Sequence, residues 1–103
     1  MAEMTKNQSN FLIRHASLRQ IQVFESVARN LSFTRAAEEL HLTQPSFLSQ
    51  FKSLVEAIEM PLYEQVGRNI YLTEVGEHVA CSCREVIDRL SNLEILLDDF
   101  RGL

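Results

Sequence analysis

The feature that most constrains the fold is the last quarter of the sequence, which has neither Gly nor Pro between Gly76 and Gly102. Thr73 can cap the start of a helix there, and no residue interrupts that helix before Gly102. Its apolar residues recur at alternating spacings of four and three, namely Val79, Cys83, Val86, Leu90, Leu93, Leu97 and Phe100. Because this is the a/d spacing of a coiled coil, residues 74–101 are predicted to form a helix roughly 40 Å long.

This predicted helix would extend past so small a domain, and its apolar stripe is broad. The pattern therefore favours a dimer interface formed by the seven seam residues. A second interpretation stays open, in which the stripe only packs against the helix's own domain. The residues that widen the stripe are Ala80, Ile87 and Leu96.

Three shorter helices are predicted before it, beginning at the cap residues Ser17, Ser32 and Thr43. The first covers about residues 18–30. Its apolar face would hold Leu18, Ile21, Phe24, Ala28 and Leu31, and its polar face Arg19, Gln22, Glu25 and Arg29. In the second helix Ala36 and Ala37 let a neighbouring helix approach closely. The third accepts Pro45 in its first turn and directs Phe47, Phe51, Leu54 and Ile58 to the core.

The break at His41-Leu42 joins the second and third helices as a helix-turn-helix. Met60-Pro61 ends the third helix. Two strand-like runs, residues 62–66 and 69–72, then flank Gly67-Arg68 as a small hairpin, or wing. The predicted fold is mainly α: a winged helix-turn-helix of three helices and a two-stranded wing, followed by a long dimerising helix.

Composition and charge limit the function classes. The net charge of −4 counts against a nucleic-acid binder, which is usually basic. Cys81 and Cys83 would point to nearly opposite sides of a helix, so no metal or cofactor is expected. His15, His41 and His78 are scattered, without a nucleophile motif or a glycine-rich phosphate loop, so no enzyme is expected. No apolar run is long enough for a membrane span or a signal peptide, which predicts a cytoplasmic protein.

Five motifs follow one another in an order typical of one family of bacterial regulators. They are Ala36-Ala37, Thr43-Gln44-Pro45, Pro61-Leu62-Tyr63-Glu64, Gly67-Arg68 and Leu72-Thr73-Glu74-Val75-Gly76. On these motifs the chain resembles the N-terminal part of LysR-type transcription regulators, with some similarity to their carbon-fixation operon subgroup. The resemblance implies an N-terminal extension (1–16), a DNA-binding winged helix-turn-helix (17–73), a linker and dimerisation helix (74–101) and the start of a hinge (102–103).

The resemblance also implies which residues contact DNA. The residues implied to contact bases are Gln44, Pro45, Ser46 and Ser49. The residues implied to contact phosphates, or DNA through the wing, are Ser32, Thr34, Arg35, Thr43, Lys52 and Arg68. The chemistry agrees, because the Gln44 amide can form a two-pronged pair with adenine at the start of a recognition helix. Plainer interpretations stay open: Gln44 as a polar first-turn residue, Arg68 as a turn residue and Lys52 as solvated surface.

Some positions depart from the family pattern. Phe47, Leu48 and Ser49 occupy positions where the family usually has a valine-like residue, Ser and often Arg. Gln65 occupies a position where Arg is common. Because Leu48, Ser49 and Gln65 remove a donor or a positive charge, modest affinity is expected for an isolated domain.

The implied partners are double-stranded DNA with an interrupted palindromic operator and a second copy of the chain, with a tetramer conceivable for a full-length protein. A small-molecule inducer would bind only through a further domain, which this shortened chain is expected to lack. One alternative remains from the acidic balance and Leu48: a protein–protein interaction module that has lost specific DNA binding.

Overall fold

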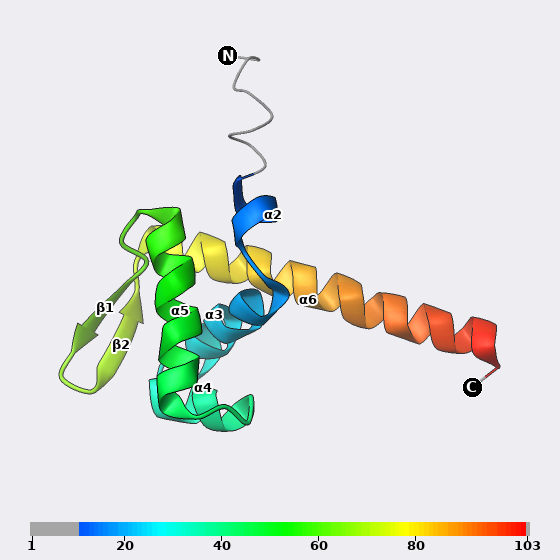
Figure 1. Cartoon of the computed structure of the whole chain (residues 1–103), viewed down its shortest axis with the longest axis horizontal. Coiled ribbons are helices and arrows are strands. Elements are labelled where there is room, and N and C mark those ends of the chain that lie inside the picture. Colours follow the sequence, from blue (N-terminus) through cyan, green and yellow to red (C-terminus); the bar gives the residue numbers. More distant parts are fainter. Residues whose placement is uncertain (1–10, 103) are drawn as a thin grey trace, which may run out of the picture.

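The computed structural model describes residues 11–102, and within that range it contains five helices and one antiparallel two-stranded sheet (Figure 1). The elements are α2 (Phe11–His15), α3 (Leu18–Asn30), α4 (Phe33–Glu39), α5 (Gln44–Ile58), β1 (Tyr63–Val66), β2 (Asn69–Leu72) and α6 (Glu74–Arg101). The predicted class is confirmed: α3, α4 and α5 form a compact unit, the hairpin lies on one side, and α6 runs out from the other.

Four helices begin at the predicted caps. The side-chain oxygens of Ser17, Ser32, Thr43 and Thr73 each accept a hydrogen bond from the backbone N–H three residues further on. At Ser17 the cap is reciprocal, because the Gln20 side chain accepts from the Ser17 N–H at 3.2 Å. Since a lost cap costs about 1 kcal/mol, these side chains fix where each helix starts.

The turn between α4 and α5 depends on His41, whose φ of 56° lies in the left-handed region. The His41 N–H donates to the Glu38 carbonyl at 3.1 Å, and the Leu42 N–H donates to the Ala37 carbonyl at 3.0 Å. These bonds close the end of α4 and allow the chain to turn before Thr43 starts α5. The turn thus sets the angle between the two helices of the helix-turn-helix.

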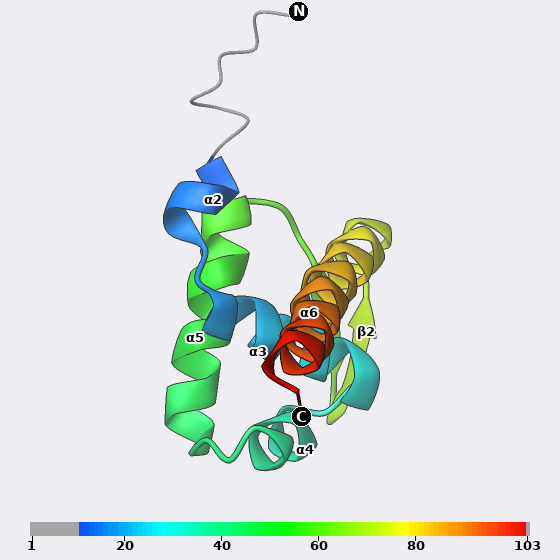
Figure 2. The same ribbon diagram turned by 90° about the vertical axis from the view of Figure 1, so that its right-hand side faces the viewer.

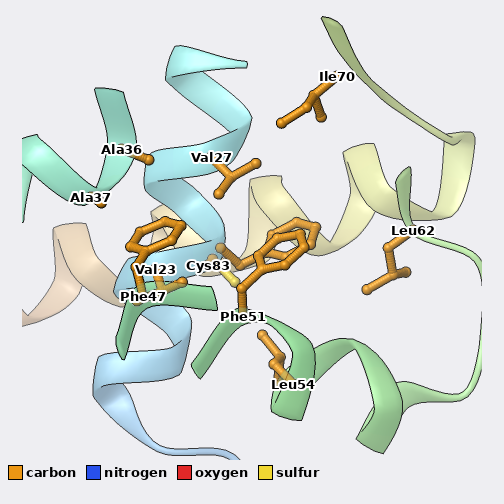
Figure 3. Packing of buried hydrophobic residues seen from close by; sticks show 11 residues of the cluster. Val23, Val27, Ala36, Ala37, Phe47, Phe51, Leu54, Leu62, Ile70 and Cys83 are labelled. Atoms are coloured by element: carbon orange, nitrogen blue, oxygen red, sulfur yellow. The ribbon is translucent and has the colours of Figure 1, made fainter. Parts of the chain in front are cut away.

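Aromatic side chains fill the core, and Phe51 of α5 lies near its centre (Figure 3). The Phe51 ring stacks on Phe24 at a centroid distance of 5.7 Å, while Phe33 and Tyr63 meet it edge-on, each at 5.1 Å. Ala36 is fully buried, and its small side chain lets α4 approach α3 closely. The core therefore joins α3, α4, α5 and the first strand.

The predicted wing is present, although its first strand begins at Tyr63 rather than Leu62. β1 and β2 pair antiparallel from Tyr63↔Leu72 to Val66↔Asn69. Gly67 turns the hairpin with a φ of 64°, a conformation that favours glycine. Ile70 is buried and attaches the hairpin to the core.

The start of α6 is fixed against the residue that precedes the wing. The Thr73 hydroxyl donates to the Pro61 carbonyl at 2.7 Å, and the Thr73 N–H donates to the Leu62 carbonyl at 3.1 Å. Gly76 lies so close to the backbone of Leu62 that an added Cβ would be 2.0 Å from the Leu62 carbonyl oxygen. Beyond its first turns α6 extends away from the domain (Figure 1), and Figure 2 views this helix nearly along its axis. No helix within residues 11–102 is both long and apolar enough to cross a membrane.

Two expectations are corrected. Residues 11–15 were expected in a loose lead-in but form the short helix α2, which packs against α5. Residues 1–10 and 103, including part of the expected extension and hinge, lie outside the described residues.

Glu25 was expected on the exposed face of α3, yet it is only 7% exposed and is held by ion pairs. Val23, Ser26 and Val27, which the predicted apolar face left out, are buried beside it.

Candidate nucleic-acid interface

The first turn of α5 presents its side chains to solvent. Gln44, Pro45 and Ser46 are exposed, whereas the next residue, Phe47, is fully buried. The buried phenylalanine anchors the first turn of α5 to the core, while the three residues at the start of the helix remain accessible to solvent. This is the arrangement that the sequence predicted for a recognition helix.

Further along α5, Ser49 and Lys52 are exposed, and they follow Pro45 at spacings of four and three. Residues so spaced share one face of a helix. Leu48 is half-buried, which explains how the chain tolerates an apolar residue where the family usually has a hydroxyl. The outer face of α5 is thus polar, and it carries the positive charge of Lys52 and, four residues further on, the negative charge of exposed Glu56.

A hydrogen bond joins the starts of the two helices of the helix-turn-helix. The Gln44 side-chain amide Nε2 donates to the Thr34 hydroxyl oxygen Oγ1 at 2.8 Å. Thr34 lies in the first turn of α4 and is itself exposed. The bond therefore places two of the predicted contact residues side by side at the surface.

The remaining predicted phosphate residues have different roles in the free protein. Ser32 and Thr43 serve as helix caps, because their oxygens accept from the Arg35 and Ser46 N–H groups at 3.2 and 3.3 Å. Arg35 is exposed in α4, and Arg68 is exposed in the turn of the wing. Figures 1 and 2 place the tip of the wing and the first turn of α5 toward the same end of the molecule, far from α2.

Ion pairs in another part of the domain neutralise four charges. The Glu25 oxygen Oε2 forms ion pairs with Arg29 Nε at 2.6 Å and with Nη2 of Arg84, in α6, at 2.8 Å. Arg29 also pairs with Glu39 of α4. The Arg29 guanidinium lowers the pKa of Glu39 to about 2, and both carboxylates raise the pKa of Arg29. Ser26 and Asn30 complete the cluster with hydrogen bonds to Glu39.

The cationic side chains predicted to contact phosphate are free of such pairing. Among residues 11–102, no ion pair involves Arg35, Lys52 or Arg68. The internal pairing of Arg29 and Arg84 with Glu25 and Glu39 cancels two positive and two negative charges, so the net charge of −4 is carried by the other residues. Within the described range, no group of His, Cys, Asp or Glu could hold a metal ion.

The geometry agrees with the comparisons to known proteins. Residues 18–77 match the family profile described as "Bacterial regulatory helix-turn-helix protein, lysR family". The chain belongs to the LysR family. The matched region contains the whole helix-turn-helix and the wing.

Two relatives of this LysR-family chain are named as transcriptional regulators. The RuBisCO operon transcriptional regulator of Acidithiobacillus ferrooxidans is 51% identical over 91 residues, which cover 88% of this chain and 29% of the relative. The HTH-type transcriptional activator CmpR of Synechocystis sp. is 47% identical, covering 88% and 30%. The chain thus spans less than a third of the length of these relatives.

Solved structures of LysR-type DNA-binding domains share the fold. The CbnR DBD–DNA complex is 27% identical with a TM-score of 0.71, and the match covers 84% of this chain and 95% of that one. The BenM DBD/catB site 1 DNA complex is 23% identical with a TM-score of 0.78, covering 84% and 98%.

The predicted dimer seam divides into two parts. Val79 packs against the domain core, and Cys83 is inside it at 6% exposure, where burial raises the pKa of its thiol to about 11. Both residues therefore contact their own domain, although Val79 is only half-buried, and the part of the seam that faces a partner stays a prediction. The other seam residues lie beyond the core: Val86, Leu90, Leu93 and Phe100 are exposed and Leu97 is half-buried.

Sequence reasoning missed the ion-pair cluster and the bond between Gln44 and Thr34. The spacing of four between Glu25 and Arg29 was a usable signal, because such residues are neighbours on a helix. The pairing of Arg84 with Glu25 and of Gln44 with Thr34 joins different helices, so neither had a sequence signal without the fold.

Proposed function

We propose that this chain binds an interrupted palindromic DNA operator as a homodimer, with the first turn of α5 in the major groove, and so regulates transcription. The observation that carries the proposal is the exposed Gln44-Pro45-Ser46 turn at the start of the second helix of a helix-turn-helix. Recognition helices present their N-terminal residues to base edges. The related CbnR domain was solved in complex with DNA, which supports DNA as the partner.

In this proposal Gln44 pairs with adenine, and the Pro45 ring contacts a thymine methyl group. Ser46 and Ser49 contribute hydrogen bonds to bases further along the groove. Phosphates are bound by Thr34, Arg35, Lys52 and, from the wing, Arg68, while Ser32 and Thr43 keep the helix starts in place. Because phosphate contacts release counterions, affinity should fall with increasing salt.

Dimerisation would use the exposed part of the seam, from Val86 to Phe100. Phe100 is 82% exposed, far more than expected for a phenylalanine without a partner surface. The seam continues at Val86 into a hollow of about 430 Å³ with an almost wholly apolar lining, which includes Leu12, Ile21 and Ile58. A second copy of α6 would cover both the exposed seam residues and this hollow. Two half-sites bound together also raise affinity through effective concentration.

The remaining parts of the proposal concern a longer protein. An inducer would act through a domain outside this chain, and dimers could assemble into a tetramer there. A regulator of this kind has no catalytic role and works where the chromosome is, in the bacterial cytoplasm.

The experiment compares Gln44→Ala with the wild type on an operator selected from a random duplex pool and on unrelated DNA. We expect Gln44→Ala to lose about 1–3 kcal/mol on the selected operator and little on unrelated DNA. The control is Asn92→Ala, which removes an exposed amide on the outer part of α6 and should leave the base preference unchanged. Equal losses on both duplexes would reject base recognition by Gln44. Failure of every duplex to bind above the non-specific level at low salt would instead support an interaction module without DNA specificity.

A further inference from the structure

The bond between Gln44 and Thr34 restrains a side chain that would otherwise rotate freely. Both residues are exposed, and they come from different helices ten positions apart in the sequence. The contact selects one orientation of the amide at the surface proposed to face DNA.

That orientation decides which atoms of Gln44 remain available. An amide group has two N–H donors and one carbonyl acceptor, and Thr34 takes one of the donors. One N–H and the carbonyl Oε1 are left. Adenine offers an acceptor and a donor at its major-groove edge, whereas guanine offers two acceptors. The remaining donor–acceptor pair of Gln44 therefore matches adenine and mismatches guanine.

Thr34 can be held in turn by the DNA. Its oxygen accepts from Gln44, so its hydroxyl proton is free to point elsewhere, and no acceptor for that proton is found within residues 11–102. A phosphate oxygen beside the start of α4 would accept it. Phosphate, Thr34 hydroxyl and Gln44 amide would then form one chain of hydrogen bonds, each fixing the direction of the next.

We propose that Thr34 is a positioning residue that sets the base preference of Gln44: it holds one N–H of the amide and directs the donor–acceptor pair that recognises adenine. This inference rests on the proposed function, since it assumes that Gln44 faces a base. It adds a role for Thr34 beyond phosphate contact, and it ties the base recognised at one position to the backbone contact made from a different helix.

The test uses four duplexes that differ only at the base pair whose preference Gln44→Ala abolishes. Dissociation constants are measured on each for the wild type, Thr34→Val and Thr34→Ser. Valine keeps the shape of threonine without its hydroxyl, and serine keeps the hydroxyl without the methyl group. Because Thr34 is exposed, all variants should fold, which thermal unfolding followed by circular dichroism checks.

We expect Thr34→Val to reduce the preference for adenine over guanine about fivefold, the equivalent of one hydrogen bond, and Thr34→Ser to retain it. In a Gln44→Ala background, Thr34→Val should no longer alter the ratio. In the free protein, the Gln44 side-chain amide protons should exchange faster in Thr34→Val than in the wild type, as measured by NMR.

A uniform loss on all four duplexes with an unchanged base ratio would overturn the positioning role and leave Thr34 as a phosphate contact only. The outcome is distinguishable from failure of the proposed function. If Gln44→Ala itself leaves the base preference unaltered, base recognition by Gln44 is wrong and this inference falls with it.

Discussion

The two parts of α6 follow the same apolar spacing but are used differently. Up to Arg84 the helix packs against its own domain: Gly76 touches Leu62, Cys83 is buried, and Arg84 pairs with Glu25. Beyond Val86 the same repeat continues along the part of α6 that extends away from the domain, where Leu90, Leu93 and Phe100 are exposed. The comparison teaches that a heptad repeat specifies an apolar stripe but not which molecule covers it.

The largest expected effect comes from disturbing the packed part. Gly76→Ala places a Cβ within 2.0 Å of the Leu62 carbonyl oxygen, a backbone atom that cannot easily move. We expect a loss of about 3 kcal/mol in the free energy of unfolding, measured by denaturant titration. Ser91→Ala, on the exposed part of the same helix, should change stability by less than about 0.5 kcal/mol.

If Gly76→Ala proved as stable as Ser91→Ala, the start of α6 would not be packed against Leu62, and the distinction between the two parts of the helix would fail.

Substitutions in the exposed part of α6 should affect dimerisation and leave the stability of the domain unchanged. Leu90→Glu combined with Leu93→Glu places like charges in the seam, so the dimer should dissociate while the domain keeps its fold. Light scattering should report a monomer, and circular dichroism an unchanged helix content. The control, Ser91→Glu with Asn92→Glu, adds the same charge beside the seam and should remain dimeric. An intact dimer in the seam variant would contradict the proposed interface.

The smallest effect concerns the ion-pair cluster that links α3, α4 and α6. The pKa of Glu39 is lowered from 4.5 to about 2, chiefly by Arg29. Its contribution to stability is therefore fully present above pH 4.5 and is lost as the pH falls toward 2. Glu39→Gln removes this titration, so the stability difference between wild type and variant should shrink over that interval. A difference that stays constant from pH 5 to 2 would show that Glu39 is not paired in solution.

Most helix boundaries could be predicted because their signals are local. A hydroxyl cap acts on an N–H three residues away, so Ser17, Ser32, Thr43 and Thr73 could be recognised without knowing the fold. These parts of the structure depend on interactions within a few residues.

What the sequence could not reveal depends on contacts between distant residues. Glu25 looked like solvent-exposed surface because its partner Arg84 is 59 positions away, and only the fold brings the two together. Cys83 matched the seam, but its burial depends on how α6 crosses α3. The partner of Gln44 was hidden for the same reason.

The close contact between Gly76 and Leu62 also has a mechanical meaning. A helix of 28 residues is about 42 Å long. If it pivots at its first turn as a stiff lever, a tilt of about 5° moves its far end by roughly 4 Å, about the rise of three residues. In a dimer joined through the far ends of two such levers, the separation of the two DNA-contacting faces would be governed by how tightly one glycine sits on one carbonyl.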